Sequence, residues 1–446
     1  MAQVYNQPLV GFVNIATPQG YSLLTAPLLI YNQTNQDFNE VADIFHAFGT
    51  GAGPGSQNGL TVFTMDGSGF KANNYLNGWT DPGMVLLPGA AWFFKNPYID
   101  TNPYIRYYST LTIAGMIADG TNQLPAGFSA CGSTVGLLAG KLTSQLMFPT
   151  TNGDQVFTFN NSNNTYSVYT FSNNNWLPGE PSIAACQPFW VNKTIAADWV
   201  QDLSDPSDPN AYYNLFVTQP ELTSQTGQLN FFTFNAADSG AGQVMDTAGN
   251  LLSTSGLGQL YAGTNANDRA FVPLARPVSF SANLPGYISS GVVSIPFVAG
   301  GQTVYVQLRA WQQADGASFE QASARGAPVG ISSTMTLTAH ATIEGNEPGI
   351  PPPDVNAFPS FQLAVLPPAP PVQIHSPSLS GTNLTFSFAS ASTRYYVLWT
   401  CTDLTTMNWV PGTFFVGTGS PIKVSLPVAN STPQQFFWVQ AIAIPD

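Results

Sequence analysis

The three histidines are the first residues to consider for chemistry, and none has a suitable partner near it in the sequence. His46, His340 and His375 lie far apart, and no second histidine or cysteine follows any of them at a metal-ligand spacing. A Ser–His–Asp triad has no fixed spacing, but the chain lacks the Gly-x-Ser-x-Gly elbow that often presents the nucleophile. We therefore interpret the histidines as structural residues and predict neither a metal site nor a hydrolytic triad.

The acidic residues do not suggest a glycosidase. Glycoside hydrolysis needs two carboxyl groups about 5–9 Å apart in a cleft. Glu40 and Asp43 are close to each other, but they begin a predicted short helix, where acids complement the helix dipole. Several other acids precede Gly or Pro at turn positions, where the side chain bonds to nearby backbone: Asp66, Asp81, Asp119 and Asp315.

One group of aspartates could offer oxygen ligands to calcium. Asp202, Asp205 and Asp208 lie together, but they lack the glycine and the terminal glutamate of a calcium-binding loop. We interpret this group as a solvated linker. The sequence thus predicts no catalytic residue, no cofactor, no metal and no enzymatic activity.

The aromatic residues leave two interpretations open. Trp79, Trp176, Tyr75 and Tyr169 lie in segments rich in Asn and Gly. If exposed, such rings could stack on sugars, while neighbouring amides bond to the hydroxyl groups. The alternative, which the recurrence of the tryptophans favours, is that they fill equivalent core corners of two repeated modules.

The cysteines allow one disulfide. Cys131 and Cys186 fall inside one predicted module and could form a bridge if the protein is exported. The alternative is that these two and Cys401 are small buried apolar residues. Three cysteines are too few for a scaffold built on disulfides.

The charge pattern excludes some partners. Only 8% of the residues are charged, against about 25% in an average soluble protein, and the net charge is −13. Nucleic acids and anionic membranes attract clusters of Lys and Arg, and the chain has none. Its apolar runs are too short to span a membrane, and residues 1–5 lack the basic start and apolar segment of a secretory signal. Either the protein is not exported or this is a mature form with an added Met1; we expect the mature form, located at the cell surface or outside the cell.

Strand signals dominate the chain. Short alternating stretches such as 303–308 and 383–388 recur between Gly, Pro and Asn, which is typical of sandwiches or barrels. We predict an all-β protein of tandem sandwiches with few short helices. The helix candidates are residues 39–48, 196–203 and 318–324.

An internal duplication organises the N-terminal half. Residues 62–65 (VFTM) match 156–159 (VFTF), and residues 91–96 (AWFFKN) match 188–193 (PFWVNK) at nearly the same separation. A Gly-aromatic-Ser step at residue 20 recurs at residue 127. The order of these landmarks predicts two copies of one β-module.

The remaining boundaries follow from composition. The predicted domains are repeat 1 (1–103), repeat 2 (104–200), a linker (201–213), a β-sandwich (214–347), a Pro-rich linker (348–371) and an immunoglobulin-like sandwich (372–446). The Pro-rich linker reads as a semi-rigid spacer, and residues 360–366 within it could add an edge strand to the preceding sandwich.

The chain resembles a large group of uncharacterised exported proteins of free-living bacteria. The resemblance rests on residues 10–14, 18–22, 88–96, 258–263, 285–287, 306–311, 395–398 and 408–409. It implies export and tandem β-sandwich modules, including an immunoglobulin-like C-terminal domain, and it transfers no catalytic residue. Many members of the group end in an anchoring segment, whereas this sequence ends at Pro445-Asp446, so we expect release or assembly.

These observations predict a non-enzymatic extracellular structural protein. It would be a subunit of a self-assembling filament, sheath or surface layer that associates through strand edges, which only five lysines can protect. Residues 3–15 alternate well enough to pair with a neighbouring subunit, although pairing within the chain is the simpler alternative. A Lys–Asn isopeptide link is conceivable, but nothing in the sequence selects a pair. The alternative function is a monomeric adhesin that binds polysaccharide.

Overall fold

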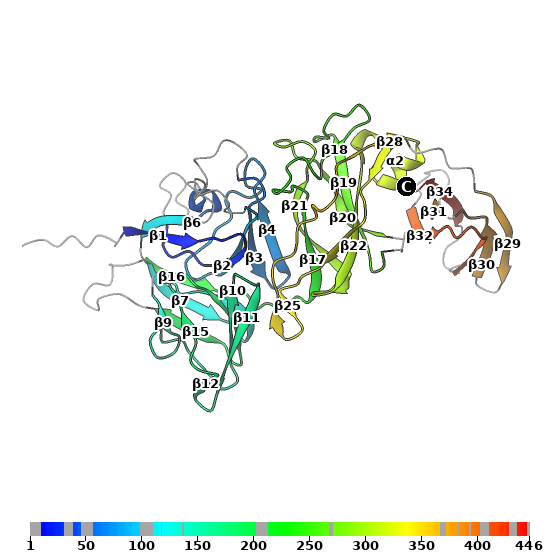
Figure 1. The fold of residues 1–446 in the computed structure, drawn as a ribbon. Helices are drawn as coiled ribbons and strands as arrows, with labels where there is room; N and C mark the ends of the chain where they lie inside the picture. The colour runs from blue at the N-terminus through cyan, green and yellow to red at the C-terminus, as the bar shows by residue number, and fades with distance from the viewer. Residues whose placement is uncertain are drawn as a thin grey trace, which may run out of the picture. The chain divides into compact units, whose positions relative to one another are not determined.

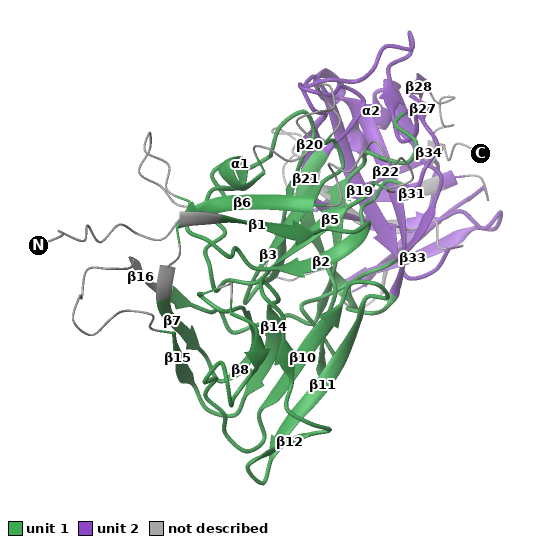
Figure 2. Cartoon of the chain, turned by 60° about the vertical axis from the view of Figure 1, so that its left-hand side comes forward, with its two compact units in different colours: residues 1–239, 289–302, 338–356 green, residues 240–288, 303–337, 357–446 purple. Residues whose placement is uncertain are grey.

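The computed structural model shows a nearly all-β chain, as predicted. It describes residues 10–30, 39–45, 57–98, 110–116, 118–135, 138–201, 213–266, 271–365, 372–380, 383–391, 394–401, 410–427 and 435–443. These residues fall into two compact units (Figures 1 and 2). Unit 1 comprises Met1–Ser239, Ser289–Gln302 and Thr338–Asn356, and unit 2 comprises Gly240–Ile288, Thr303–Leu337 and Ala357–Asp446.

Repeat 1 is built on a four-stranded sheet in unit 1. Its strand order is β2 (Gly20–Leu24), β5 (Trp92–Asn96), β3 (Thr61–Asp66) and β4 (Gly69–Asn74). Trp92 and Phe94 point into the core of the repeat, which includes helix α1 (Val41–Ile44), whereas Phe93 points to the opposite face. Both faces are covered, so β5 is apolar almost without interruption.

Repeat 2 has a sheet of the same order with one extra strand. The strands are β8 (Gly127–Cys131), β14 (Phe189–Lys193), β10 (Gln155–Asn160), β11 (Thr165–Ser172) and β12 (Asn175–Leu177). The registers also correspond, because Phe63 lies opposite Phe93 in repeat 1 and Phe157 lies opposite Trp190 in repeat 2.

The two sheets pack against each other through equivalent faces. This inter-repeat cluster contains Leu23, Phe63, Phe70, Phe93, Ala130, Phe157, Phe159, Trp190, Leu222 and Ile343. The rings of Phe93 and Phe159 meet edge-on, with centroids 5.2 Å apart and planes at 86°. Such pairs add about 0.5–1.5 kcal/mol to the burial of the rings. The duplication therefore produces two modules with one shared apolar layer.

Two smaller sheets complete the repeat region. Strand β1 (Val10–Ala16) pairs antiparallel with β6 (Thr110–Met116). Strand β7 (Ala118–Leu124) lies between β15 (Ala197–Gln201) and β16 (Tyr213–Thr218), which is parallel to it. The helix predicted at 196–203 is wrong. Trp199 is fully buried while its neighbour Val200 is 58% exposed, so the alternation has the period of a strand.

Later segments of the chain return to unit 1. Strand β17 (Thr226–Phe232) pairs with β21 (Ser289–Ala299), and β25 (Ile343–Glu344) pairs with β26 (Glu347–Pro348). Unit 1 thus contains both repeats and parts of the predicted third sandwich, whose boundaries stay predictions.

The stretch after Pro348, predicted as a spacer, is packed into unit 1 instead. Pro351, Pro352 and Val355 are buried. The physical reason is backbone pairing, because Val355 donates to the carbonyl of Asn230 at 3.1 Å and Asn230 donates to that of Pro353 at 2.9 Å. A proline-rich composition indicates that a segment is stiff, but it does not indicate whether that segment is exposed or packed against other strands.

Unit 2 holds a larger antiparallel sheet. Its order is β20 (Val272–Ser279), β19 (Gly256–Gly263), β22 (Thr303–Gln312), β23 (Pro328–Ile331) and β28 (Ala364–Val365), and β24 (Met335–Thr338) also pairs with β22. Helix α2 (Phe319–Ala324) begins at Ser318, whose side chain accepts a bond from the Gln321 amide. The apolar core between this sheet and helix α2 includes Tyr261, Trp311 and Phe319. Strand β28 lies at the sheet edge, where residues 360–366 were expected.

The C-terminal part of unit 2 is a small sandwich, as predicted. One sheet contains β29 (Ile374–Ser380), β30 (Asn383–Phe388) and β33 (Ile422–Pro427). The other contains β32 (Val410–Val416), β31 (Arg394–Cys401) and β34 (Phe436–Ala443). Phe388, Tyr396 and Leu398 belong to the cluster between them. In the described part of the chain, no helix is both long and apolar enough to span a membrane.

Candidate functional site

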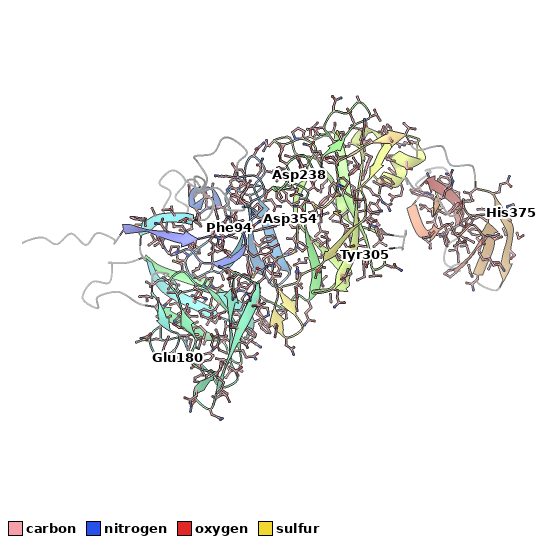
Figure 3. The ribbon with its side chains drawn as sticks, in the orientation of Figure 1. Phe94, Glu180, Asp238, Tyr305, Asp354 and His375 are labelled. Atoms are coloured by element: carbon pink, nitrogen blue, oxygen red, sulfur yellow. The ribbon has the colours of Figure 1, made fainter. Side chains whose placement is uncertain are left out.

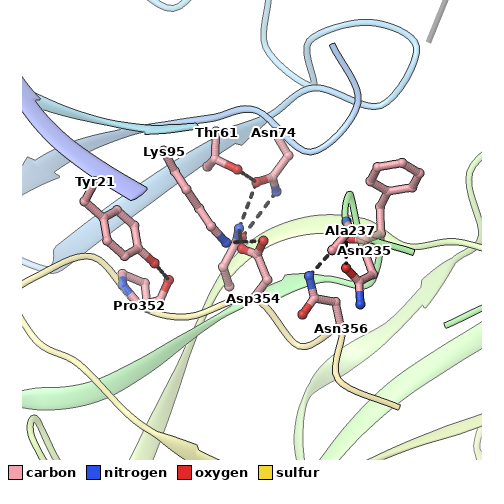
Figure 4. A network of polar contacts seen from close by, with 11 residues as sticks. Tyr21, Thr61, Asn74, Lys95, Asn235, Ala237, Pro352, Asp354 and Asn356 are labelled. Carbon is pink, nitrogen blue, oxygen red and sulfur yellow. Dashed lines mark hydrogen bonds and ion pairs between the residues drawn. The ribbon is translucent and has the colours of Figure 1, made fainter. Parts of the chain in front are cut away.

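A buried polar network in unit 1 is the main concentration of reactive groups (Figure 4). Lys95 of β5 contacts the Oδ2 atom of Asp354 with its Nζ atom, and the two side chains are 18% and 4% exposed. The Oδ1 atom of the same carboxylate accepts a bond of 2.8 Å from Nδ2 of Asn230. One carboxylate therefore connects an amine and a carboxamide.

Two further residues close the network. Asn230 and Asn74 exchange amide hydrogen bonds, at 2.8 Å from Asn230 to Asn74 and 3.2 Å in the reverse direction. The hydroxyl of Thr61 donates to Oδ1 of Asn74 at 3.0 Å. Both asparagines are fully buried. A network whose members are all bonded is rigid and specific, whereas a broken one leaves costly unpaired groups.

Strand geometry explains why these residues meet. Lys95 lies two residues after Phe93 and shares its face of β5, because side chains alternate along a strand. Asn74 lies at the end of β4. A parallel bridge between Asn230 and Asp354 brings the acid beside β17. The site therefore depends on pairing between segments that are far apart in the sequence.

Burial and nearby charges act in opposite directions on the ionisation of this site. Burial, the largest single effect, lowers the pKa of Lys95, but the charge of Asp354, the neighbouring Tyr21 and the bond to Asp354 together outweigh it and hold the pKa above its ordinary value. Burial raises the pKa of Tyr21, whose ring lies 5.9 Å from the Lys95 nitrogen, to about 12. Lys95 and Asp354 thus form an internal ion pair beside a neutral phenol.

A second internal ion pair belongs to repeat 2. Lys193 and Asp154 are in contact, and both side chains are completely buried. Lys193 also donates to the carbonyl of Pro149 at 2.7 Å. Asp154 accepts bonds at 2.8 and 2.9 Å from the amide and hydroxyl of Thr194. This pair lies inside the module and fastens strand β14 to the beginning of β10.

Unit 2 contains a third buried charged group. Arg309 lies 3.9 Å from Glu320, and its guanidinium lies 3.9 Å from the centre of the Tyr261 ring. The hydroxyl of Tyr261 donates to Glu320 at 2.6 Å. These contacts connect β19 and β22 to helix α2.

Sequence pattern alone does not point to these charged groups as a site. A usable signal was present, because Lys95 is the last residue but one of the apolar stretch 91–96 and Lys193 is the last of the matching stretch 188–193, in a chain with only five lysines. Their partners Asp354 and Asp154 have no comparable signal, because ordinary turn positions in loops also carry aspartate.

The predicted aromatic residues pack with the cores of the two repeats. Trp176 is 7% exposed, packs against Phe171 with centroids 5.2 Å apart, and donates from Nε1 to the hydroxyl of Thr143 at 2.8 Å. Trp79 is half-buried and meets Tyr75 edge-on at 5.3 Å. Tyr169 is half-buried against the repeat 2 core. The buried ring of Trp176 offers no face to a sugar.

All three cysteines are buried, and Cys131 and Cys186 are free thiols, so the predicted bridge between these two is not present in the structure. Cys131 belongs to the core of repeat 2, whereas Cys186 packs into that of repeat 1. Burial raises the pKa of both thiols, that of Cys186 to about 11. They behave as small apolar residues.

The other predicted positions show local roles. His340 bonds to Glu344 at 2.8 Å, and His375 lies in β29 (Figure 3). His46 and the aspartates at 202, 205 and 208 lie outside the described residues. Glu180, labelled in the same figure, accepts bonds from the amides of Thr143 and Ser144. Among the described residues, no three His, Cys, Asp or Glu side chains gather as metal ligands.

Two depressions on unit 1 have little reactive chemistry. One of about 190 Å³ is lined by apolar, hydroxyl and amide side chains, including Met65, Trp92 and Gln219. The other, of about 440 Å³, contains Asp198 as its only ionisable side chain. Neither depression brings two acids together.

Comparison with known proteins adds no family: no family model matches the chain, and no curated protein matches it. The resemblance to exported bacterial proteins therefore stays a prediction.

Proposed function

We propose that this chain is a non-enzymatic structural protein of the cell exterior, a subunit of a self-assembling filament, sheath or surface layer. The observation that carries the proposal is a set of uncharged sheet edges bearing exposed apolar side chains. An unpaired edge offers a row of backbone donors and acceptors to another chain.

Three edge strands illustrate this property. Strands β1, β12 and β28 have a hydrogen-bonded neighbour on one side only in the described part of the chain, and none carries a charged residue. Phe12 on β1 is 70% exposed, Leu177 on β12 is 59% exposed and Val365 on β28 is 60% exposed. Proteins that remain monomeric usually protect their edges with very short strands, lysine, proline or a bulge. Strand β1 is therefore the main candidate, because it has seven residues, whereas β12 has three and is followed by Pro178, and β28 has two.

The internal position of the charged groups supports a structural role. Lys95, Lys193 and Arg309 are paired inside the fold and lock strands together. An extracellular scaffold benefits from such locks, because its subunits must resist unfolding without repair. The alternative, a monomeric polysaccharide-binding adhesin, has less support because Trp176 is buried.

Light scattering and negative-stain microscopy of the purified chain at increasing concentration test the proposal. We expect ordered polymers or lattices. Part of the segment 3–15 is strand β1, which already pairs with β6, so deleting it would damage unit 1. The sharper variant is Phe12→Lys, which charges the exposed edge of β1 and should slow or abolish assembly.

A matched control separates edge pairing from general surface hydrophobicity. Met147 is 79% exposed and lies outside the strands, so Met147→Lys makes the same chemical change away from an edge. Assembly should survive Met147→Lys and fail in Phe12→Lys. A wild-type chain that remains monomeric at every concentration would refute intrinsic self-assembly.

A further inference from the structure

Lys95, Asn230 and Asp354 place an amine and a carboxamide on the two oxygens of one carboxylate. Lys95 contacts Oδ2 and Asn230 donates to Oδ1. All three side chains lie in a largely buried site, with Tyr21 beside the amine. A carboxylate in this position can accept a proton from one nitrogen and deliver it to the other.

We propose that Lys95 and Asn230 become joined by an intramolecular isopeptide bond, with Asp354 as the proton carrier. The resting form of the site is the ion pair. Transfer of a proton from the Lys95 ammonium to Asp354 gives a neutral amine and a neutral acid, the reactive form, and burial lowers the cost of this transfer because two charges are removed. The amine attacks Cγ of Asn230, and the bond from Cγ to Nδ2 breaks.

The atoms balance without an oxidant or a second reactant. Nζ starts as an ammonium and gives up two protons, the first to Asp354 before the attack and the second as the new bond forms. The departing amide nitrogen takes up both by way of Asp354, which ends as a carboxylate. The products are one new amide, between Nζ of Lys95 and Cγ of Asn230, and one ammonium ion, so the neutral chain loses the mass of one ammonia molecule. Asn74, which bonds to both polar atoms of the Asn230 carboxamide, holds the acceptor in place.

The contacts favour Asn230 over Asp354 as the acyl partner. If Lys95 attacked Asp354 itself, water would leave, but the network would contain no other carboxyl group to carry the protons. Attack on Asn230 leaves Asp354 free to carry the protons, because its carboxylate already contacts both Lys95 and Asn230. The link would tie β5 of repeat 1 to β17.

The second lysine–aspartate pair provides a control within the same chain. The Asp154 side chain bonds to Lys193, Thr151 and Thr194, and none of these has a carboxamide. Lys193 should therefore remain a free amine although its burial is deeper.

The test is the intact mass of the full-length chain after denaturation. We expect a mass below that of the sequence by one ammonia molecule, and a proteolytic fragment in which the Lys95 and Asn230 peptides are joined. Lys193 should appear in an unmodified peptide. An intact mass equal to the sequence mass overturns the proposal, as does loss of one water with Lys95 joined to Asp354.

Two variants extend the test. Lys95→Arg keeps the charge but cannot form the link, so it should regain the full sequence mass, whereas Lys193→Arg should keep the ammonia deficit. Loss of the deficit in Lys193→Arg alone would contradict the assignment. The readout uses denatured single chains, so its outcome is independent of whether the chain assembles.

Discussion

Each repeat has a buried lysine on the equivalent strand, but the two lysines occupy positions that differ by one residue. This difference changes the partner to which each lysine is bound. Lys95 on β5 occupies the place of Asn192 on β14, and Asn96 occupies that of Lys193, because Gly20 pairs with Asn96 and Gly127 with Lys193. Successive residues of a strand point to opposite faces. Lys193 therefore turns into its module, and Lys95 turns outward to a distant segment.

The partner positions differ accordingly. Gly59 and Gly153 have the same left-handed backbone, with φ of 97°, and each lies two residues before the matching strand, β3 or β10. The next residue is Leu60 in repeat 1 and Asp154 in repeat 2. Both are fully buried, and their carbonyls accept equivalent bonds from Tyr75 and Phe171. Three positions therefore differ between the copies: Leu60 and Asn96 stand in place of the internal pair Asp154 and Lys193, and Lys95 in place of Asn192 puts a lysine on the other face.

The largest effect should come from removing the internal clamp. Lys193→Met leaves Asp154 buried without its counter-charge, and breaking such a pair typically costs about 3–5 kcal/mol. Urea unfolding should show this loss in the free energy of unfolding. A loss below about 1 kcal/mol would mean that the clamp contributes no more than a surface ion pair.

Transplanting the clamp into repeat 1 sharpens the comparison. Asn96→Lys alone buries an unpaired ammonium beside Leu60, and Leu60→Asp alone buries an unpaired carboxylate, so each should destabilise strongly. Together they reproduce the Lys193–Asp154 pair, and we expect a favourable coupling energy of about 1–3 kcal/mol in a double-mutant cycle. Additive losses would show that the two strands are not equivalent at this position.

Tyr21 distinguishes the repeats at high pH. Burial raises its pKa from 10.0 to about 12, and the equivalent residue in repeat 2 is Phe128. The unfolded chain loses the phenol proton near pH 10, while the folded chain keeps it. The associated stability is therefore complete below pH 10 and is lost as the pH rises toward 12. Tyr21→Phe should lose less free energy of unfolding across this range than the wild type. An equal loss in both proteins would show that Tyr21 ionises as freely in the folded chain.

The smallest effect is expected at the β3–β4 turn. Asp66 accepts a bond from the Ser68 amide and pairs with the exposed Lys71, and Asn160 accepts the same turn bond from Ser162 in repeat 2. Burial raises the pKa of Asp66, but the bonds from Lys71 and Ser68 outweigh it and lower the pKa overall. Asp66→Asn should therefore cost less than about 1 kcal/mol at neutral pH, and the cost should vanish in acid. Thermal unfolding at neutral and at acidic pH would measure this cost. A cost above about 1 kcal/mol at neutral pH would show that the Asp66–Lys71 pair contributes more than an ordinary surface ion pair.

The sequence predicted those features that depend on local pattern. Alternation identified strands such as β22 and β30, and the helix candidate at residues 318–324 corresponds to helix α2. It failed at 196–203, where Trp199 and the polar residues around it also fit a helical period. Residues 197–201 form a strand instead of a helix because β15 pairs with β7 over its whole length.

The candidate site was beyond the reach of local pattern. Lys95, Asn230 and Asp354 come from three distant segments, and each residue alone has an ordinary explanation in its own loop or strand. The pairing of β17 with the stretch after Pro353 brings them together, and non-local pairing leaves no periodic trace in a single sequence.

The discontinuity of unit 1 has a consequence for biogenesis. A chain that emerges from its N-terminus can form both repeat sheets early, but β21 and Asp354 reach unit 1 only after segments of unit 2 have been made. Contacts of large sequence separation form slowly. Closure of unit 1 is therefore a late step that requires residue 356 to have emerged, and a chain stopped before that point would expose Lys95, Asn74 and Asn230 without their acid.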